Sequence, residues 1–124
     1  MIVREKEVLI VEDNEDNSIL AEKILKYYGF KTTVISDGAK AIQYCETNTP
    51  DLILMDLSLP DIDGMEVTRQ LRKISSFQHT PIIALTAHAM KGIYETTQEA
   101  GLDDFLAKPF LPNDLITLVN KYLK

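Results

Sequence analysis

The feature that most constrains the fold is the alternation of short apolar runs with longer stretches of helical period. Such runs, bounded by turn residues and rich in Val and Ile, predict buried strands. Alternation of strands and helices implies β-α-β crossovers, so we expect an α/β protein with a parallel sheet and helices on both faces. The first, third and fourth runs are the most apolar, which predicts that they lie centrally. The five runs are EVLIV (7–11), KTTVIS (31–36), DLILM (51–55), PIIALT (81–86) and DFLA (104–107).

Apolar stripes mark the first and the last of the helices between and after these runs. Gly29 and Gly101 stand where a helix end needs a residue that tolerates left-handed geometry. The predicted stripe consists of Ile19, Ile24 and Tyr28 in the first helix, and of Leu115, Leu118, Val119, Tyr122 and Leu123 in the last.

Composition narrows the class of protein. A chain of 124 residues suits one domain with one core. Its net charge of −6 argues against binding to nucleic acid, and Arg69, Arg72 and Lys73 at helical spacing predict a solvated face. No apolar run approaches the roughly 18 residues of a membrane span, and the start MIVREKE has no secretory pattern. We therefore expect a cytoplasmic protein without a membrane segment, in which Cys45 is a packing residue.

The third run ends on an acidic residue, in the stretch PDLILMDLSLPDIDG (50–64). A buried strand here places the Asp56 carboxylate at the carboxyl end of the sheet, where a lone carboxylate is costly to bury. Parallel sheets bind their ligands beyond the carboxyl ends of the strands. The polar residues expected at that edge are Glu12 and Asp13 after the first strand, Asp56, Thr86 and Lys108.

These residue types together predict a phosphoryl acceptor. Three crowded carboxylates repel one another unless a cation compensates them. Because neither Cys nor His stands at a strand end, the oxygen-only donors favour Mg²⁺ over zinc. Lys108 and Thr86 suit the oxygens of an incoming phosphoryl group. Taken singly, each residue has a structural alternative, such as a surface lysine or a helix-start acid.

Four motifs in this order resemble the receiver domain of two-component response regulators: VLIVEDN, MDLSLPDIDG, ALTA and AKPF. The resemblance covers residues 7–123. It implies a five-stranded parallel sheet with five helices, (βα)5, in the flavodoxin-like order. It also implies that residues 1–124 form a single, stand-alone receiver domain with no output domain.

The resemblance assigns roles residue by residue. It makes Asp56 the phosphorylated residue and Glu12 and Asp13 an acid pair. Mg²⁺, or Mn²⁺, is expected on Asp13, Asp56 and the backbone carbonyl of Ser58, with Glu12 acting through water.

Further roles follow from the same resemblance. Thr86 and Lys108 are the expected catalytic hydroxyl and amine, and the Lys108–Pro109 bond is expected to be cis. Ser58 and His88 flank the route of water to the phosphorylated residue and are expected to tune dephosphorylation.

The implied activity is signalling rather than turnover. The chain is expected to take a phosphoryl group from a sensor histidine kinase or a histidine phosphotransfer domain, and to catalyse only its own phosphorylation and dephosphorylation. Thr86 would then move toward the phosphate and Phe105 into the space behind it. A target protein would bind the face formed by the fourth helix (90–100), the fifth strand and the last helix, or the chain would pass the phosphate on as a phosphorelay intermediate.

Three other classes of protein fit the sequence less well. A haloacid-dehalogenase-type phosphatase needs a second aspartate two residues after the nucleophile, where this chain has Ser58. A receiver-like module that binds without phosphorylation typically loses an acid or the lysine, and none is lost here. A flavin-mononucleotide carrier needs a Gly- and Ser-rich phosphate loop, but the first loop reads EDNEDN.

Overall fold

The structure is a computed structural model that describes residues 5–87 and 98–123 of the chain. Its five strands form one parallel sheet in the order β2-β1-β3-β4-β5, as predicted. The predicted fourth helix lies mostly outside the described residues, and residues 98–100 are helical. The elements in chain order are β1 (Glu7–Val11), α1 (Glu15–Tyr27), β2 (Lys31–Ile35), α2 (Gly38–Thr47), β3 (Leu52–Asp56), α3 (Gly64–Arg72), the short 3₁₀ helix η1 (Ser75–Phe77), β4 (Ile82–Thr86), β5 (Asp104–Ala107) and α5 (Pro112–Leu123).

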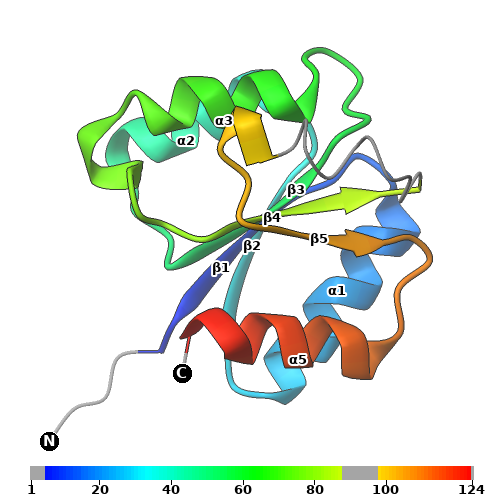
Figure 1. Ribbon diagram of the computed structural model, residues 1–124. Coiled ribbons are helices and arrows are strands. Elements are labelled where there is room, and N and C mark those ends of the chain that lie inside the picture. Colours follow the sequence, from blue (N-terminus) through cyan, green and yellow to red (C-terminus); the bar gives the residue numbers. More distant parts are fainter. Residues whose placement is uncertain (1–4, 88–97, 124) are drawn as a thin grey trace, which may run out of the picture.

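Helices cover both faces of the sheet, with α1 and α5 on one face and α2 and α3 on the other (Figure 1). Alternate residues of a strand point to opposite faces, so one strand serves two cores. In β1, Val8 and Ile10 join the core under α1 and α5, whereas Leu9 and Val11 join the core under α2 and α3. This arrangement confirms the predicted α/β class.

The central strands are the ones that the sequence marks as most apolar. Every residue of β3 and β4 is buried, including Asp56 and Thr86 at their ends. The predicted bounds of β1 and β5 are confirmed, and β3 begins at Leu52 and includes Asp56 as its last residue.

The predicted stripe of α1 is wrong in part. Ile19 is 40% exposed, and Tyr28, which follows the helix, is 51% exposed. The small side chains of Ser18 and Ala21 let the helix approach the sheet closely, so these two residues are buried in place of Ile19 and Tyr28. The buried face of α1 consists of Ser18, Ala21, Ile24 and Leu25.

The stripe of α5 and the two helix-end glycines agree with prediction. Leu115 and Val119 are buried, and the other three predicted positions pack against the same core. Gly29 and Gly101 have φ angles of 91° and 103°, the left-handed conformation that favours glycine. Among the described helices, none is long and apolar enough to cross a membrane.

Candidate functional site

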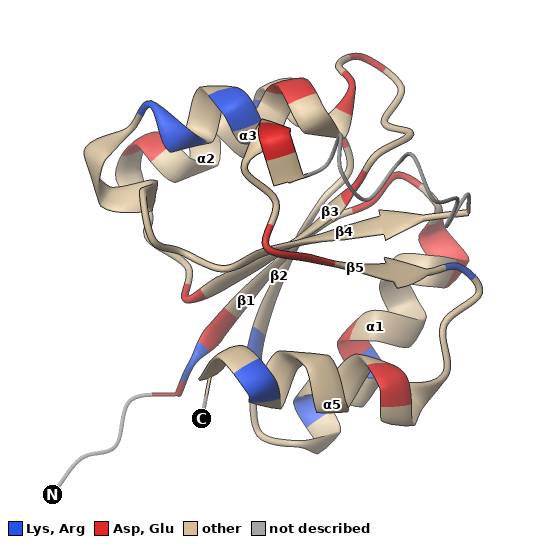
Figure 2. Cartoon of the chain, viewed as in Figure 1, with Lys and Arg blue, Asp and Glu red and all other residues tan. Residues whose placement is uncertain are grey.

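Three acidic side chains gather at the carboxyl ends of β1 and β3. Glu12, Asp13 and Asp56 each offer a carboxylate oxygen, and these oxygens lie within 4.8 Å of one another. Figure 2 shows the same edge of the sheet, where an acidic segment follows β1 and a basic segment follows β5. The three predicted carboxylates therefore converge, and we refer to these three residues as the acidic cluster.

Lys108 joins the acidic cluster from the end of β5. Its Nζ lies 3.2 Å from Glu12 Oε1 and 3.2 Å from Asp56 Oδ1. The peptide bond between Lys108 and Pro109 is cis, as expected. One amine thus contacts two buried carboxylates, while Asp13 stays exposed.

The protonation of the site follows from burial and charge. Burial, followed by the nearby Asp56 carboxylate, raises the pKa of Glu12 to about 7. Burial also acts to raise the pKa of Asp56, but hydrogen bonds from Glu12 and the Ser58 amide, together with Lys108, outweigh it and lower that pKa. Burial acts to lower the pKa of Lys108, and the two carboxylates reverse this and raise it. These opposite shifts make Asp56 the more acidic member of the buried pair.

The backbone around Asp56 is closely fixed. The Ser58 amide donates to Asp56 Oδ1 at 2.9 Å, and the Leu57 amide donates to the Leu85 carbonyl at 3.1 Å. A Cβ at Gly64, the first residue of α3, would collide with the backbone oxygen of Asp56. Glycine at this position allows α3 to start directly against the end of β3.

The structure describes three of the other predicted site residues, and they differ in burial. Thr86 is the buried last residue of β4 and pairs with Ala107 in the sheet. Phe105 in β5 is half-buried and packs against the core under α2 and α3. Ser58 is exposed, and His88 lies outside the described residues.

The sequence did not predict the hydrogen bonds of Arg72. Arg72 was expected on a solvated face with Arg69 and Lys73, but its guanidinium donates to three backbone carbonyls and a carboxylate. The prediction failed because helical spacing does not show which side chain turns inward. The four acceptors of Arg72 are the carbonyls of Phe77, Thr80 and Gly101 and the carboxylate of Asp103, at 2.7–3.0 Å.

A second missed residue is Asp61, whose carboxylate accepts the amides of Gly38 and Ala39 in α2. No local pattern connects positions 61 and 38, which are 23 residues apart.

Cys45 is buried as predicted, and burial raises the pKa of its thiol to about 12, which marks it as a packing residue.

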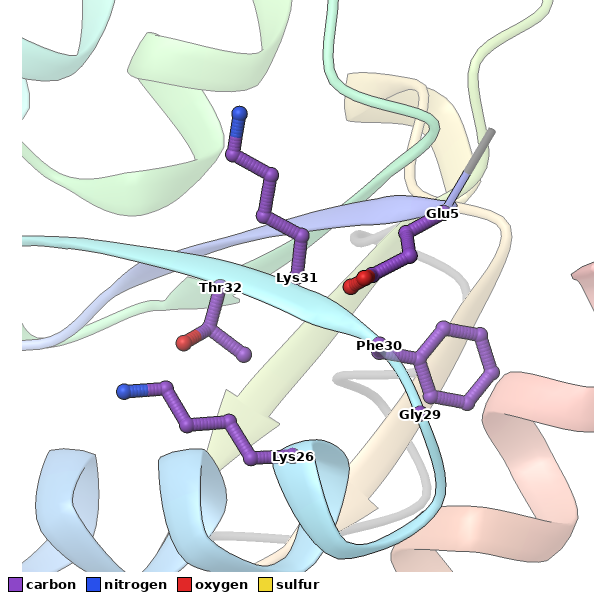
Figure 3. Close-up of a pocket in the computed structure, with 6 residues that line it drawn as sticks. All are labelled: Glu5, Lys26, Gly29, Phe30, Lys31 and Thr32. Carbon is purple, nitrogen blue, oxygen red and sulfur yellow. The ribbon is translucent and has the colours of Figure 1, made fainter. Parts of the chain in front are cut away.

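A cavity of about 520 Å³ lies away from this site, between the end of α1 and the start of β2. Figure 3 shows the amines of Lys26 and Lys31 directed away from the ring of Phe30. None of the predicted site residues contributes to it. Its lining residues are Glu5, Lys26, Gly29, Phe30, Lys31 and Thr32.

The strand order and the polar groups at the carboxyl ends of the strands define a flavodoxin-like α/β protein with its site at that edge. Within this class, the chain belongs to the response regulator receiver domain family, whose model matches residues 8–120. Proteins of this family are signalling proteins rather than classical enzymes. The match agrees with the four motifs and gives no support to a phosphatase or a flavin carrier.

Individual relatives and structures support the same family. The polar-differentiation response regulator DivK of Brucella anthropi is 38% identical over 118 residues, covering 95% of this chain and 96% of that protein. The receiver domain of sensor histidine kinase PA1611 from Pseudomonas aeruginosa superposes with a TM-score of 0.89 at 38% identity, covering 97% of this chain and 98% of that one. That structure has a magnesium ion coordinated in its active site cleft. The chemotaxis response regulator CheY4 of Vibrio cholerae, at 24% identity, covers 96% of this chain and 99% of its own, and its TM-score of 0.92 supports the fold.

Proposed function

We propose that this receiver domain accepts a phosphoryl group on Asp56 from a phosphohistidine of a sensor histidine kinase or a histidine phosphotransfer domain. The observation that carries the proposal is a buried, ionised carboxylate held against Lys108 at 3.2 Å inside an acidic cluster. Burying a charge costs free energy, and buried ionisable groups with shifted pKa values are concentrated at functional sites.

The acidic cluster fits a divalent cation that prefers oxygen donors. Its three carboxylates and the Lys108 amine carry a net charge of −2 when all four groups are ionised. Asp13, Asp56 and the backbone carbonyl of Ser58 would hold Mg²⁺, with Glu12 acting through water, and Mn²⁺ accepts the same donors. When bound, the cation supplies positive charge to the phosphoryl oxygens. The magnesium in the PA1611 receiver domain supports this assignment.

The residues of the chain supply the nucleophile and its orientation. An oxygen of Asp56 attacks phosphorus as the bond from phosphorus to the donor's histidine nitrogen breaks, and that nitrogen keeps the electron pair. Lys108 compensates negative charge on the transferred oxygens, and the Ser58 amide orients the carboxylate. The product is an acyl phosphate on Asp56, so the chain catalyses only its own phosphorylation and its loss.

Phosphorylation then changes the surface that a partner protein recognises. The acyl phosphate carries about −1.5 to −2 of charge at neutral pH in place of the single charge of the carboxylate, and its oxygens draw the Thr86 hydroxyl toward them. Thr86 and Phe105 occupy neighbouring strands, since Phe105 pairs with Ala84 in β4. In the proposal, Phe105 moves inward and the face of residues 90–100, β5 and α5 binds a target protein. Ser58 and His88 set the lifetime of the phosphate.

The remaining expectations are part of the same proposal. Residues 1–124 act as one receiver domain, supported by the family match and the single sheet. The partners are proteins and not nucleic acid, supported by the net charge of −6. We place the protein in the cytoplasm, where a kinase's phosphohistidine is available.

Intact-mass measurement after incubation with phosphoramidate tests the proposal. We expect one Mg²⁺-dependent phosphoryl adduct on the wild-type protein and none on Asp56→Asn. Lys108→Ala should slow its formation by about 100-fold or more, the usual scale for loss of a charge-stabilising donor. A folded wild-type protein that forms no adduct with Mg²⁺ would instead support a binding module that works without phosphorylation.

A further inference from the structure

The loop of residues 57–63 carries the backbone groups of Ser58 into the site. It leaves β3 at Leu57 and enters α3 after Asp63, whose side chain accepts the Met65 amide at 2.9 Å. Both ends of the loop are therefore fixed to the scaffold. Ser58 itself is exposed, so burial does not fix its position.

The middle of this loop is tied to a different helix. Asp61 Oδ1 accepts the Gly38 amide at 2.8 Å, and Asp61 Oδ2 accepts the Ala39 amide at 2.9 Å. Both carboxylate oxygens are thus engaged by the first two amides of α2. These two hydrogen bonds lower the pKa of Asp61, so the carboxylate is charged at neutral pH and lies at the positive end of the helix.

The chain makes room for this contact at Gly38. A Cβ at that position would lie 2.7 Å from Val67 Cγ2 and 3.3 Å from Ile62 Cβ. Glycine therefore lets the loop and α3 pack directly on the start of α2. The steric fit and the two hydrogen bonds are independent observations of the same close approach.

A helix cap alone does not explain Asp61, because α2 has a cap of its own. Asp37, the residue before the helix, accepts the Lys40 amide at 2.8 Å. Asp37 and Asp61 thus serve the same helix end, but Asp37 comes from the segment that enters α2 and does not tie down the loop of residues 57–63.

We infer that Asp61 is a positioning residue for the phosphoryl acceptor: by fastening the loop of residues 57–63 to α2, it holds the Ser58 backbone where its amide orients Asp56 and its carbonyl faces the cation site. The inference rests on the proposed function. In this role Asp61 does not contact the phosphoryl group. Helix α2 supports the site indirectly, through the loop of residues 57–63.

The pair of Asp61 and Asp37 provides a matched test. Calorimetric titration with Mg²⁺ and the rate of phosphoramidate labelling would be measured for wild type, Asp61→Ala, Asp61→Asn and Asp37→Ala. We expect Asp61→Ala to weaken Mg²⁺ binding about tenfold, the scale on which supporting residues act on a metal site. Asp61→Asn, which keeps one acceptor oxygen, should lose less. Asp37→Ala should lower the melting temperature of the protein but leave Mg²⁺ affinity and labelling at the wild-type level.

A readout on Ser58 itself separates the outcomes. Its amide NMR resonance should move in both Asp61 variants of the apo protein and stay in place in Asp37→Ala. Equal Mg²⁺ affinity in Asp61→Ala and Asp37→Ala, with the Ser58 resonance unmoved, would overturn the inference. If wild type binds no Mg²⁺ and forms no adduct, the proposed function fails, and the Ser58 resonance still decides whether Asp61 positions the loop.

Discussion

Lys108 and Asp56 show how single residues set the chemistry of the site. Asp56 is 1% exposed, and its carboxylate is stabilised by one ammonium group and one backbone amide. Glu12 competes for the same ammonium group, and burial with the neighbouring charge raises its pKa to about 7. The three carboxylates of the acidic cluster are suited to binding a positively charged ligand. Their arrangement adds little to the stability of the fold.

Replacing Asp56 by Asn should therefore stabilise the Mg²⁺-free protein. The change removes one carboxylate from the acidic cluster and relieves its repulsion of Glu12, while the shape of the side chain stays the same, so we expect a rise of a few degrees in melting temperature, equivalent to roughly 1 kcal/mol. Thermal unfolding monitored by circular dichroism measures it. Asp16→Asn, at an exposed position in the first turn of α1, should give no rise. A clear loss of stability in Asp56→Asn would mean that the favourable contacts of the Asp56 carboxylate with Lys108 outweigh its repulsion of Glu12.

Burial of Cys45 makes the stability of the protein depend on pH in the alkaline range. Burial, with a smaller effect of Glu7, raises the pKa of its thiol from 9.0 to about 12. The thiol stays neutral in the folded state and ionises in the unfolded state above about pH 9, so its contribution to stability is complete below pH 9 and falls as pH rises toward 12. Between pH 8 and pH 10, wild type should lose about 1 kcal/mol more unfolding free energy in urea than Cys45→Ala. Equal losses in the two proteins would contradict this assignment.

At the scale of elements, Arg72 joins helix α3 to the segments that precede β4 and β5. It donates to the Thr80 carbonyl before β4 and to the Gly101 carbonyl before β5. Asp103 accepts from both Arg72 and the Ile82 amide at 2.9 Å, which ties the start of β5 to the start of β4. The strand that ends in Thr86 and the strand that Lys108 follows are thus fixed at their opposite ends.

Removing this side chain should cost far more than removing its neighbour. Arg72→Ala leaves several partly buried acceptors without a donor, and we expect a loss of roughly 2–3 kcal/mol of unfolding free energy in urea. Arg69→Ala removes an exposed pair with Glu66 and should change it by less than about 0.5 kcal/mol. Similar effects of the two substitutions would show that the contacts of Arg72 add nothing to stability.

The elements were predictable to different degrees. The strands follow from apolar runs, and β1 and β5 have the predicted bounds. The face of α1 was mispredicted because Ser18 and Ala21 are buried for their small size, which a search for apolar residues overlooks. Contacts between elements, such as those of Asp61 and Arg72, depend on tertiary distances that one sequence does not encode locally.

At the scale of the whole molecule, the site was predictable because parallel topology brings strand ends together. Once β1, β3, β4 and β5 run parallel in one sheet, the residues at their carboxyl ends, including Glu12, Asp56 and Lys108, lie at the same edge. What topology alone does not give is which carboxylate is ionised and how the loop after β3 is supported. Those depend on burial and on hydrogen bonds from other elements.

Locating the acyl phosphate decides whether Asp56 is the residue that carries the phosphoryl group. Borohydride reduces an aspartyl phosphate to homoserine, which peptide mass mapping finds at a single position. After phosphoramidate and Mg²⁺ treatment, we predict homoserine at position 56 and at no other aspartate. Homoserine at position 13, or a phosphoryl adduct that borohydride does not convert, would rule out Asp56 as the phosphorylated residue.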